Sequence, residues 1–295
     1  MIKVGQLIKR IIYKLHEYGK LVMFSHTIFS LSFAVVSLLA ASKGRPDPRI
    51  ILWAGLALLG ARTGANAVNR MIDAKIDAEN PRTADRQLPR GQLQTFEAAA
   101  LTIFCFIILL ISSWQLNPLC MYLSPLALLL MIVYSYTKRF TWLCHLVLGI
   151  TCACAPVGAW LAVTGSFSWE ALFLGGANCL WTAGFDIIYG SQDYEFDKAY
   201  GLYSIPVRFG ISGALTISTL FHIAAFFCLS VFGWLLYPGL GPIYAGGLLI
   251  IALLMLVQHK IVSPSHLENV NIASYSISQI TSIVFLVFGV LDIYF

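Results

Sequence analysis

Long apolar runs are the feature that most restricts what this chain can fold into. They recur along nearly the whole sequence, and each is long enough to cross a ~30 Å hydrocarbon layer as a helix of about 20 residues. Only 11% of the residues are charged, against about a quarter in soluble domains. The sequence therefore predicts an integral membrane protein. The nine predicted spans are residues 21–42, 50–72, 95–115, 118–137, 141–163, 167–190, 212–236, 242–259 and 270–292.

The runs predict helices and not the strands of a β-barrel. Barrel strands are segments of about 10 residues in which apolar and polar side chains alternate. Runs such as LTIFCFIILLIS, residues 101–112, do not alternate. No low-complexity linker or separate polar region interrupts the chain. We expect an all-α polytopic membrane protein, in which residues 1–295 form a single domain built as a bundle of nine transmembrane helices.

The positions of Lys and Arg outside the spans predict the orientation, because these residues accumulate in cytoplasmic loops. They occur before the first span and after the second, fourth, sixth and eighth spans, whereas the opposite loops contain only Lys43, Arg45 and Arg49. We therefore expect a cytoplasmic N-terminus and an external C-terminus. The net charge of +5 then reflects topology, and nucleic-acid binding is not expected.

Two features of the sequence could be taken for a signal peptide and for a zinc or disulfide site. The first apolar run follows a basic segment and ends in LAAS, as a signal peptide does, but it is too long for an h-region, so we expect a retained helix. All seven cysteines lie in apolar spans, and no histidine has ligand spacing beside Cys152 and Cys154. We expect these cysteines to be buried packing residues and neither zinc ligands nor disulfides.

An acidic cluster stands at the end of the second span. Asn69, Asp73 and Asp77 are spaced i, i+4, i+8, so they share one face if this span stays helical to its end. Ionisable groups near membrane depth are rare unless they are functional, and neighbouring carboxylates repel one another unless a positive charge lies between them. A solvated helix end is the alternative interpretation.

A second acidic cluster follows the sixth span, about 120 residues later. Asp186, Asp193 and Asp197 are spaced i, i+7, i+11, which again predicts a single helix face. Each cluster is followed by a polar loop, a Leu-Pro or Ile-Pro pair and an Arg shortly before a Gly, in QLPRG and SIPVRFG. We interpret this as a weak internal duplication, with acidic segments at 69–77 and 186–197 that face one another across a cavity.

The residue types of both clusters favour magnesium. Mg²⁺ prefers carboxylate and other oxygen ligands and is often completed by the phosphate oxygens of a substrate. Softer metals prefer His or Cys, which are absent at both places. Nearby bases would neutralise the remaining phosphate charge, so the pattern predicts a magnesium-diphosphate site. The predicted metal ligands are Asn69, Asp73, Asp77, Asp193 and Asp197.

Several basic residues are candidates for binding the substrate. Arg62 lies about two helical turns deeper than Asn69 on the same face, and Lys138 follows Tyr134 by four residues, which predicts a shared face. For the loop residues, positive-inside topology is the alternative interpretation. The further candidates for the diphosphate are Arg82, Arg86, Arg139, Lys198 and Arg208.

These motifs resemble those of the UbiA superfamily of intramembrane prenyltransferases. The contexts NPRTADRQLPRG and DxxYxxQDxxFDxxxGLxSIPxRFG are similar to the branch that prenylates small aromatic acids in quinone synthesis. FSHTIFSLSFA resembles the first helix of the family, although Ser32 stands where proline is expected. The family pattern N-x-x-x-D-x-x-x-D matches Asn69, Asp73 and Asp77, its D-x-x-x-D matches Asp193 and Asp197, and its Y-x-x-x-K matches Tyr134 and Lys138.

The resemblance implies a helical bundle around a central cavity, Mg²⁺ held by the two aspartate motifs and a polyprenyl diphosphate as the donor. It implies a small aromatic acid as the acceptor, 4-hydroxybenzoate in ubiquinone biosynthesis. A dihydroxynaphthoate in menaquinone biosynthesis is the alternative, and a macrocycle acceptor is a further one. We expect the protein to lie in the bacterial inner membrane with its active-site loops in the cytoplasm.

The same residues define an expected mechanism. Metal held by Asp73, Asp77, Asp193 and Asp197 would stabilise the departing diphosphate, and a dry cavity would keep water from the allylic cation. Arg62 is the candidate for an acceptor carboxylate. For Asp186 two roles remain open, a base for the ring proton or a support for neighbouring groups.

A membrane transporter is the main alternative from another class, because repeated halves with intramembrane acids also describe ion-coupled carriers. Carriers place such groups near the bilayer midplane, whereas both clusters here lie at span ends on the basic side. That position favours an enzyme. A purely structural membrane protein would leave the doubled aspartates unexplained.

Overall fold

The structure, a computed structural model, describes residues 13–14, 16–22 and 27–295. Within these ranges the chain is built from helices and short loops. A π-helical segment, η4 (Ile272–Ile277), and two 3₁₀ turns, η2 (Thr137–Arg139) and η3 (Ser191–Asp193), stand beside the α-helices. The α-helices are α2 (Thr27–Ala41), α3 (Pro48–Glu79), α4 (Thr95–Leu116), α5 (Pro118–Tyr134), α6 (Cys144–Thr164), α7 (Trp169–Gly190), α8 (Tyr194–Tyr200), α9 (Ile205–Leu236), α10 (Pro242–Lys260) and α11 (Ser278–Tyr294).

A helix occupies each predicted span, which confirms the all-α membrane fold. In the described part of the chain, seven helical segments are long and apolar enough to cross a membrane, and α2 and α5 are shorter apolar helices. The first span was expected to begin at residue 21, but α2 begins at Thr27 and residues 23–26 lie outside the described ranges, as does most of the basic N-terminal segment. The helix α2 continues through Ser32 without interruption.

Capping residues fix where the helices begin. The helices α3 and α5 each begin with a proline directly after the capping residue. These pairs are Asp47-Pro48 and Asn117-Pro118. The Asp47 side chain accepts a hydrogen bond from the backbone N of Arg49 (2.8 Å), and Asn117 accepts one from Cys120 (3.0 Å). Such caps satisfy N–H groups that have no partner within the helix. The α6 helix ends at Thr164 and is capped by Gly165, which adopts a left-handed conformation.

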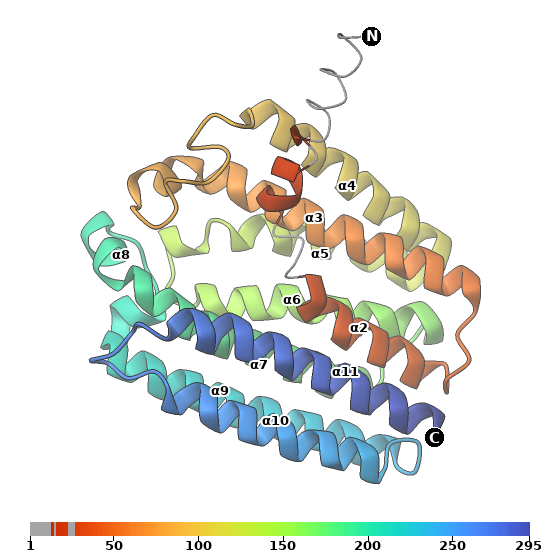
Figure 1. Ribbon diagram of the computed structural model, residues 1–295. Helices are drawn as coiled ribbons and strands as arrows, with labels where there is room; N and C mark the ends of the chain where they lie inside the picture. The colour runs from red at the N-terminus through yellow and green to blue at the C-terminus, as the bar shows by residue number, and fades with distance from the viewer. Residues whose placement is uncertain (1–12, 15, 23–26) are drawn as a thin grey trace, which may run out of the picture.

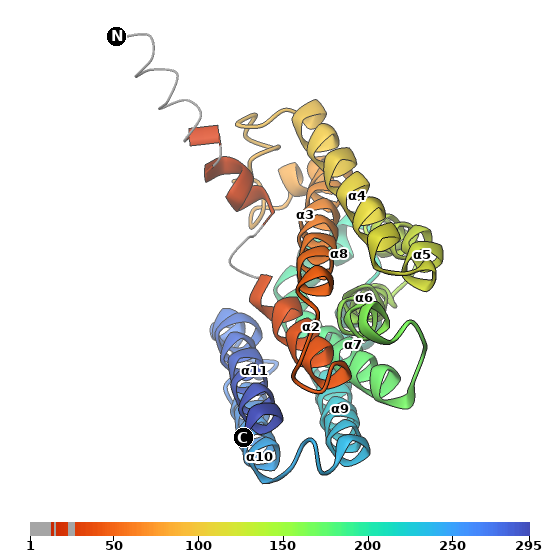
Figure 2. The same ribbon diagram turned by 90° about the vertical axis from the view of Figure 1, so that its right-hand side faces the viewer.

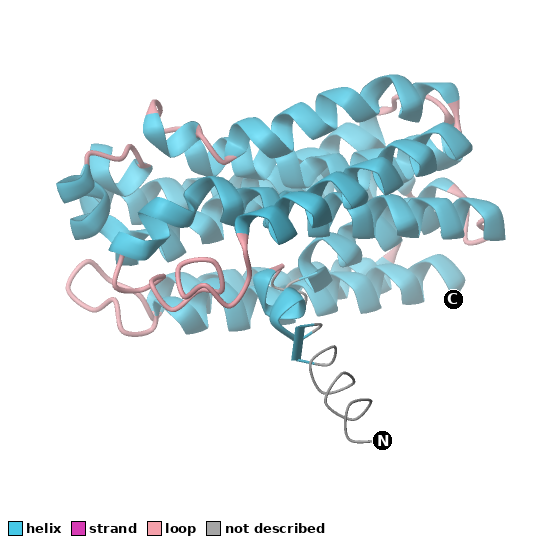
Figure 3. Cartoon of the chain, turned by 90° about the horizontal axis from the view of Figure 1, so that it is seen from above, coloured by secondary structure: helices cyan, strands magenta, loops and turns pink. Residues whose placement is uncertain are grey.

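The helices lie side by side, and the connecting loops gather at the two ends of the bundle (Figures 1 and 3). Figure 2 shows α3, α4 and α5 on one side, and α7, α9, α10 and α11 on the other, with α2 and α6 between them. The α2 helix packs chiefly on α6 and α11, whereas α3 packs chiefly on α4. Consecutive helices α2 and α3 are therefore not close neighbours, and this separation leaves room within the bundle.

Two glycines one turn apart allow α3 and α4 to approach closely. A Cβ atom on Gly60 would lie 2.7 Å from the backbone oxygen of Cys105, and one on Gly64 would lie 2.6 Å from the ring of Phe106. Small residues at this spacing are a frequent device for packing transmembrane helices, because lipid supplies no hydrophobic force between them. The two glycines of GARTG, residues 60–64, therefore allow α3 to pack closely against α4.

The main core is a set of stacked aromatic rings between α2, α7 and α11. The ring of Phe33 stacks on Phe285 with centroids 4.5 Å apart and on Trp181 at 5.4 Å. All three side chains are buried. Offset stacking adds to the burial of these large surfaces. The core thus lies on one side of the bundle, away from α3, α4 and α5.

Replacing Gly64 with leucine is expected to destabilise the protein by about 1–3 kcal/mol, because the new side chain would overlap Phe106. The control is Gly55→Leu in the same helix, where an added Cβ atom meets nothing within 4 Å. Thermal unfolding of the detergent-solubilised proteins measures the difference. Equal melting temperatures for the two variants would contradict this account of the α3–α4 contact.

Candidate active site

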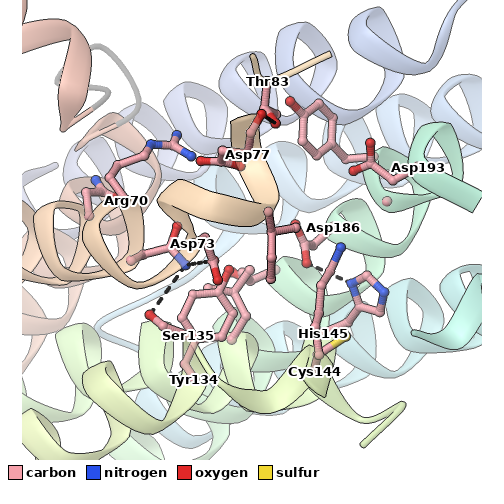
Figure 4. Close-up of a pocket in the computed structure, with 18 of the residues that line it drawn as sticks. Arg70, Asp73, Asp77, Thr83, Tyr134, Ser135, Cys144, His145, Asp186 and Asp193 are labelled. Carbon is pink, nitrogen blue, oxygen red and sulfur yellow. Dashed lines mark hydrogen bonds and ion pairs between the residues drawn. The ribbon is translucent and has the colours of Figure 1, made fainter. Parts of the chain in front are cut away.

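A charged cavity of about 230 Å³ lies between the ends of α3, α5, α6 and α7 (Figure 4). Both acidic clusters line it, and so do most of the predicted bases. The sequence-predicted residues in its wall are Arg62, Asn69, Asp73, Asp77, Arg82, Arg86, Tyr134, Lys138, Arg139, Asp186, Asp193 and Asp197.

The first cluster lies on successive turns of α3, as its spacing predicts. Because α3 stays helical to Glu79, Asn69, Asp73 and Asp77 point from one face into the cavity. The Asn69 amide donates to Asp73 (2.9 Å) and lies 3.4 Å from the hydroxyl oxygen of Ser135 on the neighbouring element. Figure 4 shows Asp73 of α3 close to Ser135, which follows the end of α5.

The prediction that Asp186, Asp193 and Asp197 share one helix face is wrong. Helix α7 ends at Gly190, the 3₁₀ turn η3 follows, and α8 starts at Tyr194. The break carries Asp193 and Asp197 onto a second, short helix. All three carboxylates nevertheless line the cavity, because the chain turns around its mouth.

A similar break separates Tyr134 from Lys138, which were expected on one helix face. Tyr134 ends α5, and Lys138 lies in η2. Both side chains still line the cavity. The turn η2 thus places Lys138 in the cavity wall although the helix that carries Tyr134 has already ended.

Each aspartate of the first motif is paired with a base from another segment. Arg86 Nη1 lies 2.6 Å and 2.7 Å from the two carboxylate oxygens of Asp77, whose side chain is buried. Arg139 donates to Asp73 at 3.1 Å and to the backbone oxygen of Ile72 at 2.8 Å. The loop after α3 and the turn η2 are thereby fastened to α3.

Arg82 makes a two-point ion pair with Asp193 in the second motif. Its Nε and Nη2 donate to the two carboxylate oxygens at 2.8 Å and 2.5 Å, and Asn80 donates to the same carboxylate at 3.2 Å. The guanidinium also lies over the ring of Tyr189. Burial opposes the charge of Arg82, but the hydrogen bond and charge of Asp193 prevail and raise the pKa of this arginine above its usual range.

Lys138 is paired with Asp197, whose side chain is only 2% exposed, at 3.1 Å. Burial would lower the pKa of Lys138, yet the negative charge of Asp197 outweighs burial and raises it above the usual value for lysine. The lysine therefore stays charged throughout the physiological range. All four motif aspartates thus have a Lys or Arg partner.

Two predicted bases lie outside the cavity wall. Lys198 follows Asp197 directly on α8, so it points about 100° away and lies over the ring of Tyr194. Arg208 is exposed in the first turns of α9. Neither residue lines the cavity, so their expected contact with a diphosphate has no structural support.

The structure adds wall residues that sequence reasoning missed. Arg70 directly follows Asn69, and Figure 4 shows its guanidinium directed toward Asp77. His145 could have been recognised in the sequence, because it is a polar residue in an otherwise apolar run. Tyr275 lies in the π-helical segment η4, whose register no simple periodicity predicts. Such segments are frequent at functional sites.

A second, apolar cavity of about 610 Å³ adjoins the charged one between α2, α3, α5 and α6. Its wall consists almost entirely of aliphatic and small side chains. Three residues, Ser30, Arg62 and Cys152, line both cavities and mark their junction. The apolar chamber extends from this junction to Pro46 and Phe167 in the loops at the opposite end of the bundle.

A family model described as the UbiA prenyltransferase family matches residues 30–282. The chain belongs to this family. The 4-hydroxybenzoate octaprenyltransferase of Shewanella woodyi is 30% identical over 252 residues, which cover 84% of this chain and 87% of that relative. This UbiA-family chain is thus an integral membrane prenyltransferase.

Solved structures share its fold. The apo structure of a UbiA homolog from Aeropyrum pernix K1 is similar with a TM-score of 0.82 and 32% identity, over 91% of this chain and 98% of that one. A UbiA homolog from Archaeoglobus fulgidus bound to DMAPP and Mg²⁺ matches with a TM-score of 0.65 and 19% identity, over 94% and 99% of the two chains. The expected membrane bundle is confirmed.

Replacing Lys138 with methionine is expected to destabilise the enzyme by about 1–3 kcal/mol, because the buried Asp197 carboxylate would lose its partner. The raised pKa of Lys138 keeps the pair intact at neutral pH, and its contribution is lost only as pH rises above the usual range of lysine. Thermal unfolding at pH 7 measures the effect.

The matched control is Lys198→Met, which removes an exposed lysine one residue from Asp197 and is expected to leave the melting temperature unchanged. Adding Asp197→Asn to Lys138→Met should recover part of the loss, since the unpaired charge is removed. A Lys138→Met protein as stable as the control would count against the pair.

Proposed function

We propose that this enzyme transfers a polyprenyl group from its diphosphate to 4-hydroxybenzoate or a closely related hydroxylated aromatic acid, in quinone biosynthesis. The observation that carries the proposal is a charged cavity that adjoins a larger apolar chamber and shares wall residues with it. A polyprenyl diphosphate has the same two parts, a charged head and an apolar tail. The name of the Shewanella woodyi relative supports 4-hydroxybenzoate as the acceptor.

The charged cavity suits a diphosphate together with Mg²⁺. Its donor set consists of carboxylate and amide oxygens, the hard ligands that Mg²⁺ prefers, so the residues fit this metal. Among the described residues no three His, Cys, Asp or Glu side chains stand together as a metal cluster. The four motif aspartates are held by bases instead. We therefore propose that the aspartates and Asn69 take up metal when a diphosphate arrives to occupy the bases.

Charge balance favours this exchange of partners. The cavity holds Arg70, Arg82, Arg86, Lys138 and Arg139, and these bases match the phosphate oxygens of a diphosphate. Bound Mg²⁺ supplies Lewis-acid stabilisation of the departing diphosphate. The raised pKa values of Arg82 and Lys138 keep both side chains protonated at neutral pH, so they can neutralise the charge of the leaving diphosphate. These bases and a bound metal would therefore stabilise the same leaving group.

Arg62 is the proposed partner of the acceptor carboxylate. It lies well inside α3, at the junction of the charged cavity and the apolar chamber, where a cation is costly unless it serves a purpose. The ring of a bound acceptor would then lie beside the first carbons of the donor tail. Close placement of the two reactants lowers the entropic part of the barrier. A dihydroxynaphthoate also carries a carboxylate and a hydroxyl group, so it remains the second candidate acceptor.

We propose that the charged end of the bundle faces the cytoplasm, with the N-terminus on that side. Three segments lie at this one end (Figure 1): the loop between α3 and α4 with Arg82, the turn η2 with Lys138 and helix α8 with Lys198. Positive residues favour the cytoplasmic side. A water-soluble acceptor would reach the cavity directly, while the tail of the donor enters from lipid. Bacterial relatives support the inner membrane as the location.

The function is tested with membranes that contain the enzyme, Mg²⁺ and a radiolabelled polyprenyl diphosphate. 4-Hydroxybenzoate and a dihydroxynaphthoic acid are supplied separately, and lipid-soluble product is counted. We expect product with 4-hydroxybenzoate, and loss of product after chelation of divalent cations. Asp73→Ala and Asp193→Ala should each reduce the rate by at least about 100-fold, because stabilisation of the leaving group is lost.

Lys198→Met is the matched control, since this base faces away from the cavity and should leave the rate unchanged. Product from the naphthoate alone would reassign the acceptor and keep the reaction class. Full activity of either aspartate variant, or unchanged turnover after chelation, would sink the metal-site proposal. A folded enzyme that makes no product with either acid would contradict the proposed acceptor class.

The apolar chamber is expected to bind the isoprenoid tail, and this is tested by filling it. Gly158 lines the chamber, and an added Cβ atom there meets nothing within 4 Å, so leucine would extend into the open space. Gly158→Leu should lower kcat/KM for a long polyprenyl diphosphate by about 10-fold or more, which is the effect of about 1.4 kcal/mol of lost binding. The five-carbon donor dimethylallyl diphosphate should be affected far less.

The control is Gly246→Leu on α10, outside the chamber wall, where the nearest atom is 4.0 Å from the added Cβ. It should leave both donors unaffected. Equal losses for the long and the short donor in Gly158→Leu would show that the chamber does not hold the tail.

A further inference from the structure

A histidine and an aspartate form a hydrogen-bonded pair in the cavity wall, apart from the metal motifs. His145 Nδ1 lies 2.8 Å from Asp186 Oδ2, and Figure 4 shows the two side chains meeting from α6 and α7. Asp186 lies seven residues before Asp193, about two helical turns farther from the mouth. The pair therefore lies deeper than the diphosphate-binding groups.

The imidazole of His145 is held tightly in place. It is 1% exposed, and a Cβ atom on Gly190 would lie 2.8 Å from its Cε1, so the ring packs against the backbone at the end of α7. Its Nε2 is buried and has no hydrogen-bond partner within the described residues. Asp186 is thus the group that orients the ring, and an ionised carboxylate can only accept, so we assign the proton of this hydrogen bond to Nδ1.

Asp186 differs from the other four aspartates of the cavity. Those four are each paired with a Lys or Arg, whereas the ion partner of Asp186 in the described structure is His145. Its side chain is 24% exposed, so the carboxylate retains an accessible part at the cavity.

We propose that His145 is a positioning residue that holds Asp186 through Oδ2, so that Oδ1 accepts the hydroxyl proton of the aromatic acceptor. This rests on the proposed function. A carboxylate needs hydrogen-bond reach and a fixed orientation to act as a base, and the imidazole N–H supplies the orientation. A catalytic base that is held in orientation by a neighbouring group is a general feature of enzyme active sites.

The step balances in atoms and electrons. The bond from the allylic carbon to the diphosphate oxygen breaks, and the diphosphate keeps the electron pair. The ring carbon beside the hydroxyl group forms the new C–C bond while the hydroxyl proton passes to Asp186, which gives a neutral dienone. That ring carbon then loses its proton to the diphosphate, and Asp186 returns its proton to the oxygen. One ring proton thus leaves with the diphosphate.

Other titratable groups surround the pair from each neighbouring element. These groups bear on any pH dependence, so the test compares variants at each pH and does not depend on the wild-type profile alone. They are Tyr134 from α5, Cys144 and Cys152 from α6, Arg62 from α3, Asp197 from α8, and Tyr189 and Tyr275 from α7 and η4.

The test compares His145→Ala and His145→Gln, because glutamine retains an N–H group that can reach the carboxylate. We expect His145→Ala to lower kcat by about 10-fold to 100-fold, part of the usual contribution of general-base catalysis. KM for the donor should stay unchanged, since the diphosphate groups are intact. His145→Gln should recover much of the rate.

A second readout separates proton transfer from a structural defect. The deficit of His145→Ala should shrink as pH rises through the ionisation of the acceptor hydroxyl, and with a ring-fluorinated acceptor whose hydroxyl is more acidic, because the base is then less needed. Gly190→Ala provides another variant, as its methyl group would displace the imidazole while keeping both side chains. It should show the same pH-dependent deficit.

A deficit that is the same for all acceptors at every pH, or wild-type rates in both His145→Ala and Gly190→Ala, would overturn the positioning role. A rate in His145→Gln no better than in a folded His145→Ala would also count against it. Failure of the proposed function is recognised separately, because the wild-type enzyme itself would then yield no product with any of the acids, and the inference would fall with it.

Discussion

The pairing of carboxylates with bases at one end of the bundle is the interaction on which the rest of the structure depends. Carboxylates buried near membrane depth are too costly to leave without a partner. The partners come from outside the long helices: Arg82 and Arg86 from the loop after α3, and Lys138 and Arg139 from the turn η2. These ion pairs therefore fold the polar loops over the bundle end. The groups that we propose to bind substrate also form the tertiary contacts that shape the cavity.

The interior changes from charged to apolar along the bundle axis, in the space between two groups of helices. The aromatic core around Phe33 and Trp181 joins α2 to α7 and α11, while Gly60 and Gly64 bind α3 to α4. Sparse packing between the two groups leaves an internal space made up of the two adjoining cavities. Its charged end holds the four ion pairs, its middle holds Asp186 and Arg62, and its far part is apolar. This order matches a substrate with a diphosphate head, a reacting allylic carbon and a long tail.

Much of the fold and of the site could be predicted from local patterns. The spans followed from apolar runs, because backbone groups in lipid must be satisfied within a helix. Asn69, Asp73 and Asp77 were placed correctly on one face, since α3 remains regular to its end. The same reasoning was wrong for Asp186, Asp193 and Asp197, because helix periodicity does not reveal the 3₁₀ turn between Gly190 and Tyr194. Lys198 and Arg208 follow the second motif closely in sequence, but neither lines the cavity.

The sequence by itself determined the membrane location, the helical class, the two aspartate motifs and their family, because each depends on composition or on spacing within a short segment. Only the tertiary structure decided which base neutralises which aspartate, and that His145 from α6 meets Asp186 from α7. It also decided that an apolar chamber adjoins the charged cavity at Arg62. Such contacts join residues far apart in the chain, and their geometry depends on how whole helices pack, which no local pattern encodes.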